Sequence, residues 1–210
     1  LCSILGAIFN LGCILDNQTL FSLISLRFFT GFFLAGIYPI GMKIATDYYQ
    51  KGLGKSLGYL VGALVLGTAL PHLLKDILIN YSWKSVLVAT SSLSVFGGLF
   101  LFIFVKDGPF RTQNKGLNLS SCFNIFKNVE FRKAAFGYFG HMWELYTFWA
   151  FVPIILMIYK NSHANVIFNI PVLSFIIIAF GSLSCVFSGY ISEKFGAKKT
   201  ASSFLFLSCL

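Results

Sequence analysis

The chain has 210 residues, of which 57% are hydrophobic and only 11% are charged. Soluble domains carry roughly 25% charged residues, so this composition excludes an ordinary soluble domain and indicates a membrane protein. The net charge of +9 does not indicate nucleic-acid binding, because the basic residues lie in separate loops between apolar runs rather than on one patch.

Seven apolar segments follow one another along the chain, and the five inner ones are each long enough to span a bilayer. They are continuously apolar rather than alternating, which predicts helices and not a barrel. We therefore expect an all-α, polytopic transmembrane helical bundle. The segments are Leu1–Leu15, Leu20–Ala45, Ser56–Ile79, Ser85–Val105, Ala134–Tyr159, Val166–Ile191 and Ala201–Leu210.

The two outer segments are short, and the chain begins at Leu1 inside an apolar run, without an initiating Met. We expect it to be an internal piece of a longer protein. Its five cysteines show no disulfide or metal-ligand spacing, so we expect reduced thiols, no metal and no cofactor.

The basic residues predict the orientation. If the loop at Tyr48–Lys55 faces the cytoplasm, twelve Lys and Arg residues lie on that side and three on the other, with Arg27 inside the membrane. This asymmetry follows the positive-inside rule and supports the number of segments.

The connection 106–133 is the longest, and we interpret it as a cytoplasmic loop between two bundles, residues 1–105 and 134–210. Asn118 or Ser120 is a candidate cap for a short helix with Leu119, Phe123, Phe126 and Val129 on one side. Such a helix, followed by basic residues, would suit an anionic membrane surface. An unstructured basic linker is the alternative.

Arg27 stands alone in the second segment, roughly 10 Å from its outer end at ~1.5 Å per residue. A charge at that depth costs a few kcal/mol unless it faces protein or water, so Arg27 is a candidate for a solute-binding residue. The alternative is an arginine that only satisfies backbone carbonyls. Pro39 predicts a kink further along the same segment.

Three glycines in the third segment, Gly54, Gly58 and Gly62, are spaced four residues apart. They share one face of a helix and predict close packing against another helix. Gly67 and Pro71 repeat the spacing on a rotated face, and we include them among the predicted packing residues.

The fifth segment holds the one acidic residue near mid-membrane, Glu144, three residues after His141. The two lie on one helical face and both can exchange protons, which is what a proton-coupled carrier requires. Trp143 and Tyr146 can bind a polar solute while excluding water. A purely structural hydrogen bond between His141 and Glu144 is the alternative, and two such ligands are too few for a metal.

Between the last two segments lies a loop that begins Gly-Tyr-Ile-Ser-Glu-Lys and ends Phe-Gly-Ala-Lys-Lys. It resembles the cytoplasmic-loop signature of the major facilitator superfamily, Gly-x-x-x-Asp-Arg-x-Gly-x-Arg-Arg, with glutamate for aspartate and lysines for the arginines. The resemblance implies a gating role for Gly189, Glu193, Lys194, Gly196, Lys198 and Lys199.

A second resemblance to this superfamily lies in the context of Arg27, which is followed by Thr30 and Gly31. It is similar to the family's fourth helix, where Arg-x-x-x-Gly faces the central cavity, and we place Tyr38 in that cavity as well. The family's antiporter pattern is matched only in part, because Pro71-His72 stands where Gly-Pro is expected, so antiport is not implied.

The resemblance implies that the chain covers the third to the ninth helix of a fold with two six-helix halves, 1–105 holding helices three to six and 134–210 helices seven to nine. We expect a secondary active transporter that moves a small solute by alternating access, with proton coupling. Arg27 favours an anionic solute. The stretch from Ala35 to Lys55 resembles uncharacterised bacterial carriers, and the resemblance implies a bacterial inner membrane.

Two other classes of membrane protein are alternatives. A seven-helix receptor or light-driven pump fits the number of segments, but a retinal pump requires a lysine in its last helix and Ala201–Leu210 has none. A membrane-embedded enzyme would need a nucleophile–base or metal constellation, and the sequence contains none, so we expect no enzymatic activity.

The twelve-to-three distribution of Lys and Arg between the two membrane faces predicts from which side single introduced cysteines can be labelled. Cysteines at Lys51, Lys115 and Lys198 should react with an impermeant thiol reagent only from the cytoplasm, and those at Asn17 and Asn161 only from outside. Labelling of positions 115 and 161 from the same side would contradict the two-bundle layout.

Overall fold

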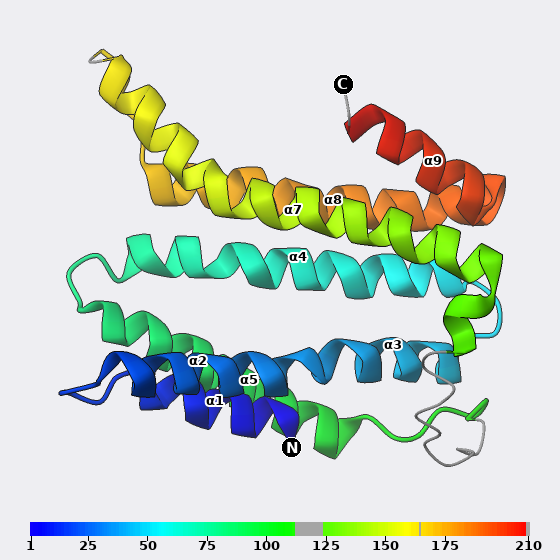
Figure 1. Ribbon diagram of the computed structural model, residues 1–210, viewed down its shortest axis with the longest axis horizontal. Helices are drawn as coiled ribbons and strands as arrows, with labels where there is room; N and C mark the ends of the chain where they lie inside the picture. The colour runs from blue at the N-terminus through cyan, green and yellow to red at the C-terminus, as the bar shows by residue number, and fades with distance from the viewer. Residues whose placement is uncertain (112–123, 164, 209–210) are drawn as a thin grey trace.

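The computed structural model describes residues 1–111, 124–163 and 165–208, and within these ranges the chain is helical, with no strand. The elements, shown in Figure 1, are α1 (Cys2–Gly12), α2 (Leu20–Ala35), α3 (Ile37–Tyr48), α4 (Leu53–Ile77), α5 (Trp83–Phe104), the short 3-10 helix η1 (Ile125–Lys127), α7 (Val129–Ser162), α8 (Ile170–Phe195) and α9 (Ala197–Ser208).

Five helical stretches are long and apolar enough to cross a membrane, and they coincide with the five inner segments predicted from the sequence. They are Leu20–Tyr48, which combines α2 and α3, and Leu53–Ile77, Trp83–Phe104, Val129–Ser162 and Ile170–Phe195. The prediction of an all-α bundle of membrane-length helices is confirmed.

Side-chain caps define several helix starts. The Thr19 hydroxyl accepts from Ser22 N at the start of α2, and Asn169 Oδ1 accepts from Val172 N at the start of α8, both at 3.2 Å. Asn128 Oδ1 caps α7 by accepting from the backbone of residues 130 and 131.

The cap at Asn128 shortens the predicted loop 106–133, because residues 129–133 form the first turns of α7. Phe126 lies in η1 and Val129 in α7, so these two do not share one short amphipathic helix. The other residues proposed for that helix, 118–120 and 123, lie outside the described residues.

The predicted kink in the second segment is present as a boundary between α2 and α3 at Gly36. Pro39 has no N–H to donate to the Ala35 carbonyl, and its ring crowds that carbonyl. Gly36 N instead donates to Phe33 O at 3.2 Å, in the tighter 3-10 manner. The break therefore falls three residues before the proline.

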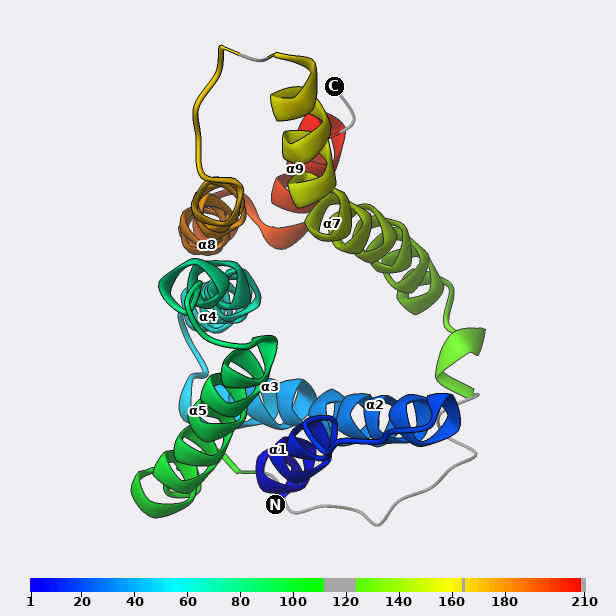
Figure 2. The same cartoon turned by 90° about the vertical axis from the view of Figure 1, so that its left-hand side faces the viewer.

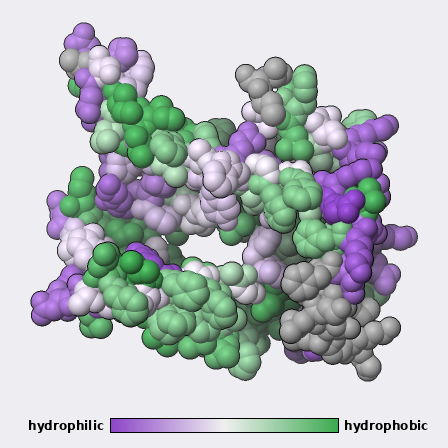
Figure 3. Space-filling view, in the orientation of Figure 1, coloured by the Kyte–Doolittle hydropathy of each residue, from purple (hydrophilic) through white to green (hydrophobic). Residues whose placement is uncertain are grey.

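The helices run back and forth between two ends of the molecule (Figure 1). We call one the basic end: it holds the α3–α4 connection, residues 105–111, η1 and the α8–α9 turn. The opposite end holds the α1–α2, α4–α5 and α7–α8 connections. Hydrophilic residues gather at both ends and hydrophobic ones between them (Figure 3), as a bilayer requires.

Two groups of helices, α1–α5 and α7–α9, meet where α4 lies beside α8, as Figures 1 and 2 both show. Among the helices that the structure describes, α4 and α8 pack against each other most extensively. Its apolar part is a buried cluster of Val65, Ala69 and Ile178, against which Phe175 and Trp149 pack. Most other apolar side chains of the spans are exposed, a surface that suits lipid hydrocarbon.

Toward the basic end, backbone meets backbone in what we call the glycine seam, made by Gly54, Gly58 and Gly62 of α4 and Gly189 of α8. A Cβ added at Gly58 would lie 2.9 Å from the Cys185 carbonyl oxygen, and one at Gly189 would lie 2.7 Å from the Gly54 carbonyl oxygen. Real Cβ atoms do not approach so closely, so the small residues are what allow this contact.

Gly67 and Pro71 are not part of this face, which corrects the prediction that they pack between helices. Both are exposed, and a Cβ at Gly67 would meet nothing within 4 Å. The reason is the five-residue step from Gly62 to Gly67, which turns the side-chain direction by about 140°.

The seam predicts that Gly58→Ala destabilises the protein by about 1–3 kcal/mol, because the added methyl must push α4 from α8. The matched control is Gly67→Ala in the same helix, which should be neutral or stabilising by up to about 1 kcal/mol. Thermal unfolding of the two variants in detergent measures the difference. Equal stability of the two would show that the seam does not constrain the packing.

Candidate functional site

At the basic end, a cluster that we call the latch joins α4 to α8; it consists of Lys55, Tyr59, Tyr190 and Glu193. Glu193 Oε2 lies 3.1 Å from Lys55 Nζ, and Glu193 Oε1 accepts from the Lys55 backbone N at 3.3 Å. The carboxylate thus binds both a cation and the N-terminal turn of a helix, where the dipole favours negative charge.

The two tyrosines extend the latch along the helices. The hydroxyl oxygens of Tyr59 and Tyr190 are 3.0 Å apart, and Lys55 Nζ lies 4.8 Å from the centre of the Tyr190 ring. Sequence reasoning missed both tyrosines. The available signal was spacing, because Tyr59 follows Lys55 by four residues and Tyr190 precedes Glu193 by three, so each shares a face with its charged neighbour.

The other residues of the predicted gating loop do not all lie at the contact with α4. Gly189 lies buried in the glycine seam, and Gly196, at φ 86°, ends α8. Lys194 Nζ lies over the Phe195 ring, 5.5 Å from its centre. Lys198 and Lys199 are exposed in α9, and no contact to Glu193 is present for them. Of the six loop residues, therefore, Gly189 and Glu193 contact α4.

Arg27 projects from α2 and is held by a residue of α1. Its Nη1 donates to Asn10 Oδ1 at 2.8 Å, and Asn10 Nδ2 donates to Ser91 Oγ of α5 at 2.9 Å. The sequence singled out Arg27 but neither of its partners, because an asparagine and a serine in different segments carry no pattern that links them.

Tyr38 is half-buried on α3, just beyond the break at Gly36. It lies within electrostatic range of Tyr138 and Tyr146 on α7 and of Cys185 on α8. Tyr38 therefore lies on the side of α3 that is near the second group of helices. Tyr138 and Cys185 were not among the predicted site residues.

On α7, His141 Nδ1 lies 3.6 Å from Glu144 Oε2, within range of an ion pair but too long for a hydrogen bond. His141 Nδ1 is buried and has no hydrogen-bond partner among the described residues. Ser208 Oγ of α9 lies 3.4 Å from Glu144 Oε2. The carboxylate is thus only weakly held, and its side chain is 45% exposed.

The aromatic residues predicted beside Glu144 form a shallow pocket of about 480 Å³ on α7, lined by Phe139, Met142, Trp143, Tyr146, Thr147 and Phe151. Trp143 is 80% exposed, whereas Tyr146 packs edge-on against Trp149, with ring centres 5.3 Å apart. Trp149 in turn touches the buried Val65 cluster, which links this face of α7 to the α4–α8 contact.

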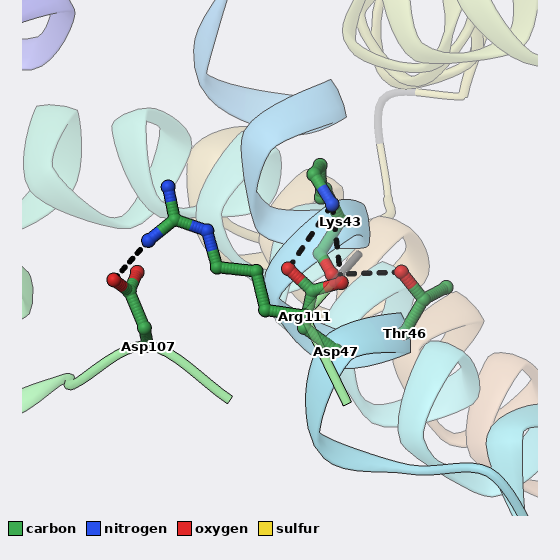
Figure 4. A network of polar contacts seen from close by, with 5 residues as sticks. All are labelled: Lys43, Thr46, Asp47, Asp107 and Arg111. Atoms are coloured by element: carbon green, nitrogen blue, oxygen red, sulfur yellow. Dashed lines mark hydrogen bonds and ion pairs between the residues drawn. The ribbon is translucent and has the colours of Figure 1, made fainter. Parts of the chain in front are cut away.

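A second polar network lies at the basic end, where the chain after α5 comes close to the end of α3 (Figure 4). Lys43 Nζ lies 3.1 Å from both carboxylate oxygens of Asp47, and Arg111 pairs with Asp107. The backbone joins them, since Phe110 N donates to Asp47 O at 3.0 Å. Tyr48 also donates to Lys106 O at 2.6 Å. No pattern of residues in the sequence predicts this contact between the two segments.

The family model of the Major Facilitator Superfamily matches the whole chain, residues 1–210. The chain belongs to the Major Facilitator Superfamily. It is accordingly a membrane-spanning protein of a transporter family. No curated protein and no solved structure matches it. Among the described residues, no group of three or more metal-ligating side chains is present.

The latch predicts the effect of Glu193→Gln. The amide keeps an acceptor for Lys55 N but loses the ion pair, which at this exposure is worth about 0–1 kcal/mol. The basic end should therefore open more readily, and transport rates in liposomes should change by up to roughly fivefold with membrane insertion unchanged.

Glu130→Gln is the matched control, because Glu130 also pairs with a lysine, Lys133 at 2.9 Å, but within α7 and away from α4. Its transport rate should equal that of the wild type. If Glu193→Gln and Glu130→Gln behave alike, Glu193 has no gating role.

Proposed function

We propose that this superfamily member is a secondary active transporter that moves a small solute by alternating access and is driven by protons. The supporting observation is the α4–α8 contact, which joins the two groups of helices at the basic end through the latch and the glycine seam. We assign the basic end to the cytoplasm, on the distribution of Lys and Arg, and the protein to a bacterial inner membrane.

The contact is of a kind that can open and close. The latch is solvent-exposed, so its ion pair contributes about 0–1 kcal/mol and the helix N-terminus about 0.3–1 kcal/mol more. The seam contains small residues and backbone rather than interlocking side chains. Separation of α4 from α8 at the basic end therefore breaks few strong interactions, as a gate requires.

The solute site is proposed between the two groups of helices, where Tyr38 of α3 lies near Tyr146 of α7. Arg27 of α2, which donates to Asn10 within the first group, is proposed to contribute to this site. Figure 3 shows an opening between the α7 side and the α2 side of the molecule. Binding at such a midplane site, with the gate closing on either side in turn, is how secondary transporters couple binding to transport.

We assign proton coupling to Glu144, with His141 as its neighbour. Glu144 lies within the membrane-spanning part of α7, where a carboxylate is costly and usually functional. Its two contacts, with His141 at 3.6 Å and Ser208 at 3.4 Å, are long, so the carboxylate is held only loosely. A carboxylate held this loosely can take up a proton on one side and release it on the other.

The alternative of a seven-helix receptor or light-driven pump is disfavoured by family membership.

Replacing Glu144 by Gln tests the coupling directly. A permanently neutral side chain cannot load or release a proton, so accumulation of solute against its gradient should fail in liposomes with an imposed pH gradient. Exchange of solute down its own gradient should persist, because the movement itself needs no proton transfer. His141→Gln should be milder and shift the pH optimum.

Two outcomes would contradict the assignment. If accumulation and exchange by Glu144→Gln both match the wild type, coupling does not involve Glu144. If both are lost while the protein remains folded, Glu144 binds the solute or stabilises the transporter rather than carrying the proton.

A further inference from the structure

A pocket of about 460 Å³ lies at the basic end, between the last turns of α3 and α5. Among the described residues that line it, none belongs to the latch or to the proposed solute site. One wall is apolar and the other is polar: Ile44, Leu101, Phe102 and Val105 belong to the first, and Lys106 and Asp107 to the second. The pocket therefore offers an apolar and a charged surface to the same ligand.

This pocket lies where two membrane spans end. The spans Leu20–Tyr48 and Trp83–Phe104 both reach their last residue here, and the charged residues follow directly after the second span. Phe102 is 84% exposed, so the apolar wall is open to the surroundings of the protein. The volume is within the range of about 300–1,000 Å³ that is typical of ligand pockets. The position suits a ligand whose apolar part lies in the hydrocarbon of the bilayer and whose polar part lies among the headgroups.

Backbone contacts hold the polar wall in place. Phe110 N donates to Asp47 O at 3.0 Å, and the Tyr48 hydroxyl donates to Lys106 O at 2.6 Å. Gly108 lies so close to α3 that an added Cβ would overlap the Asp47 carbonyl group. The chain after α5 is therefore fixed against α3, and a ligand that enters the pocket needs to order little of the protein.

The charges around the pocket do not cancel. Figure 4 shows that Lys43 pairs with Asp47 and that Arg111 pairs with Asp107. Both carboxylates therefore already have a cation. Lys106 lines the pocket as well, and it forms no ion pair within the described part of the chain. Three cations and two carboxylates leave one positive charge, which a single ionised phosphodiester would complement.

We propose that this pocket binds an anionic phospholipid of the leaflet at the basic end, with an acyl chain against the apolar wall and the phosphate on Lys106 Nζ. A charge-assisted hydrogen bond from the ammonium group to the phosphate holds the headgroup, and anionic lipids already gather near basic residues at a membrane surface. A zwitterionic headgroup such as phosphoethanolamine fits less well, because its own ammonium group finds both nearby carboxylates occupied. The inference does not depend on the proposed transport function.

Lipid retention by the purified full-length protein tests the proposal. The delipidated protein in detergent is titrated with dioleoyl phosphatidylglycerol or dioleoyl phosphatidylethanolamine, which have the same acyl chains, and native mass spectrometry measures the affinity for the first lipid bound. The wild type should retain phosphatidylglycerol more tightly. Lys106→Gln should weaken this binding roughly tenfold and leave phosphatidylethanolamine unchanged, because the amide keeps a donor and loses the charge.

The matched control is Lys51→Gln, which removes the same charge from an exposed residue at the same end, in the α3–α4 connection and outside the pocket. It should retain phosphatidylglycerol like the wild type. Val105→Trp tests the apolar wall, because the larger side chain fills the pocket while every charge remains, and it should also weaken the binding.

Three results would overturn the proposal. The first is a wild type that retains phosphatidylethanolamine as tightly as phosphatidylglycerol, or neither lipid. The second is an equal loss in Lys106→Gln and Lys51→Gln, which would show that anionic lipid is attracted by the whole basic end. The third is a folded Val105→Trp protein that binds phosphatidylglycerol like the wild type, which would place the lipid elsewhere.

Discussion

The close approach of α4 to α8 is the contact on which the arrangement of the two groups of helices depends. Its character changes along the helices: backbone against backbone in the glycine seam, the buried Val65 cluster farther along, and Asp76 with Asn169 at the opposite end. Large apolar side chains resist separation more than small ones. We infer that α4 tilts on α8 about this cluster, so that opening the basic end closes the other.

Two charges of opposite sign lie within the membrane on different groups of helices, Arg27 on α2 and Glu144 on α7. Each is held by neutral or weak contacts rather than by a strong ion pair, Arg27 by Asn10 and Glu144 by His141 and Ser208. A transporter needs groups of this kind, because a charge already paired in the protein has little to offer a solute or a proton. Their weak pairing is therefore consistent with function.

The sequence predicted the features that depend on composition and local spacing: the five spans, the break near Pro39 and the face formed by Gly54, Gly58 and Gly62. It did not predict what depends on which helices meet. Asn10 and Ser91 are ordinary polar residues until α1 and α5 bring them together, and Tyr59 gains a role only beside Tyr190. Gly67 follows Gly62 by five residues and so points away from the seam, and its four-residue spacing to Pro71 does not show which face of the helix is covered.

The proposed alternating access requires the α4–α8 contact to open at one end as it closes at the other. Spin labels at Gln50 and Lys198 report the basic end, and labels at Ile79 and Ile167 report the opposite end, because these positions are exposed on the two sides of the contact. Pulsed electron resonance of both pairs in liposomes, with and without a pH gradient, measures the distances. We expect two distances for each pair, with the longer distance at the basic end populated when the distance at the opposite end is short. A single unchanging distance for both pairs would contradict it.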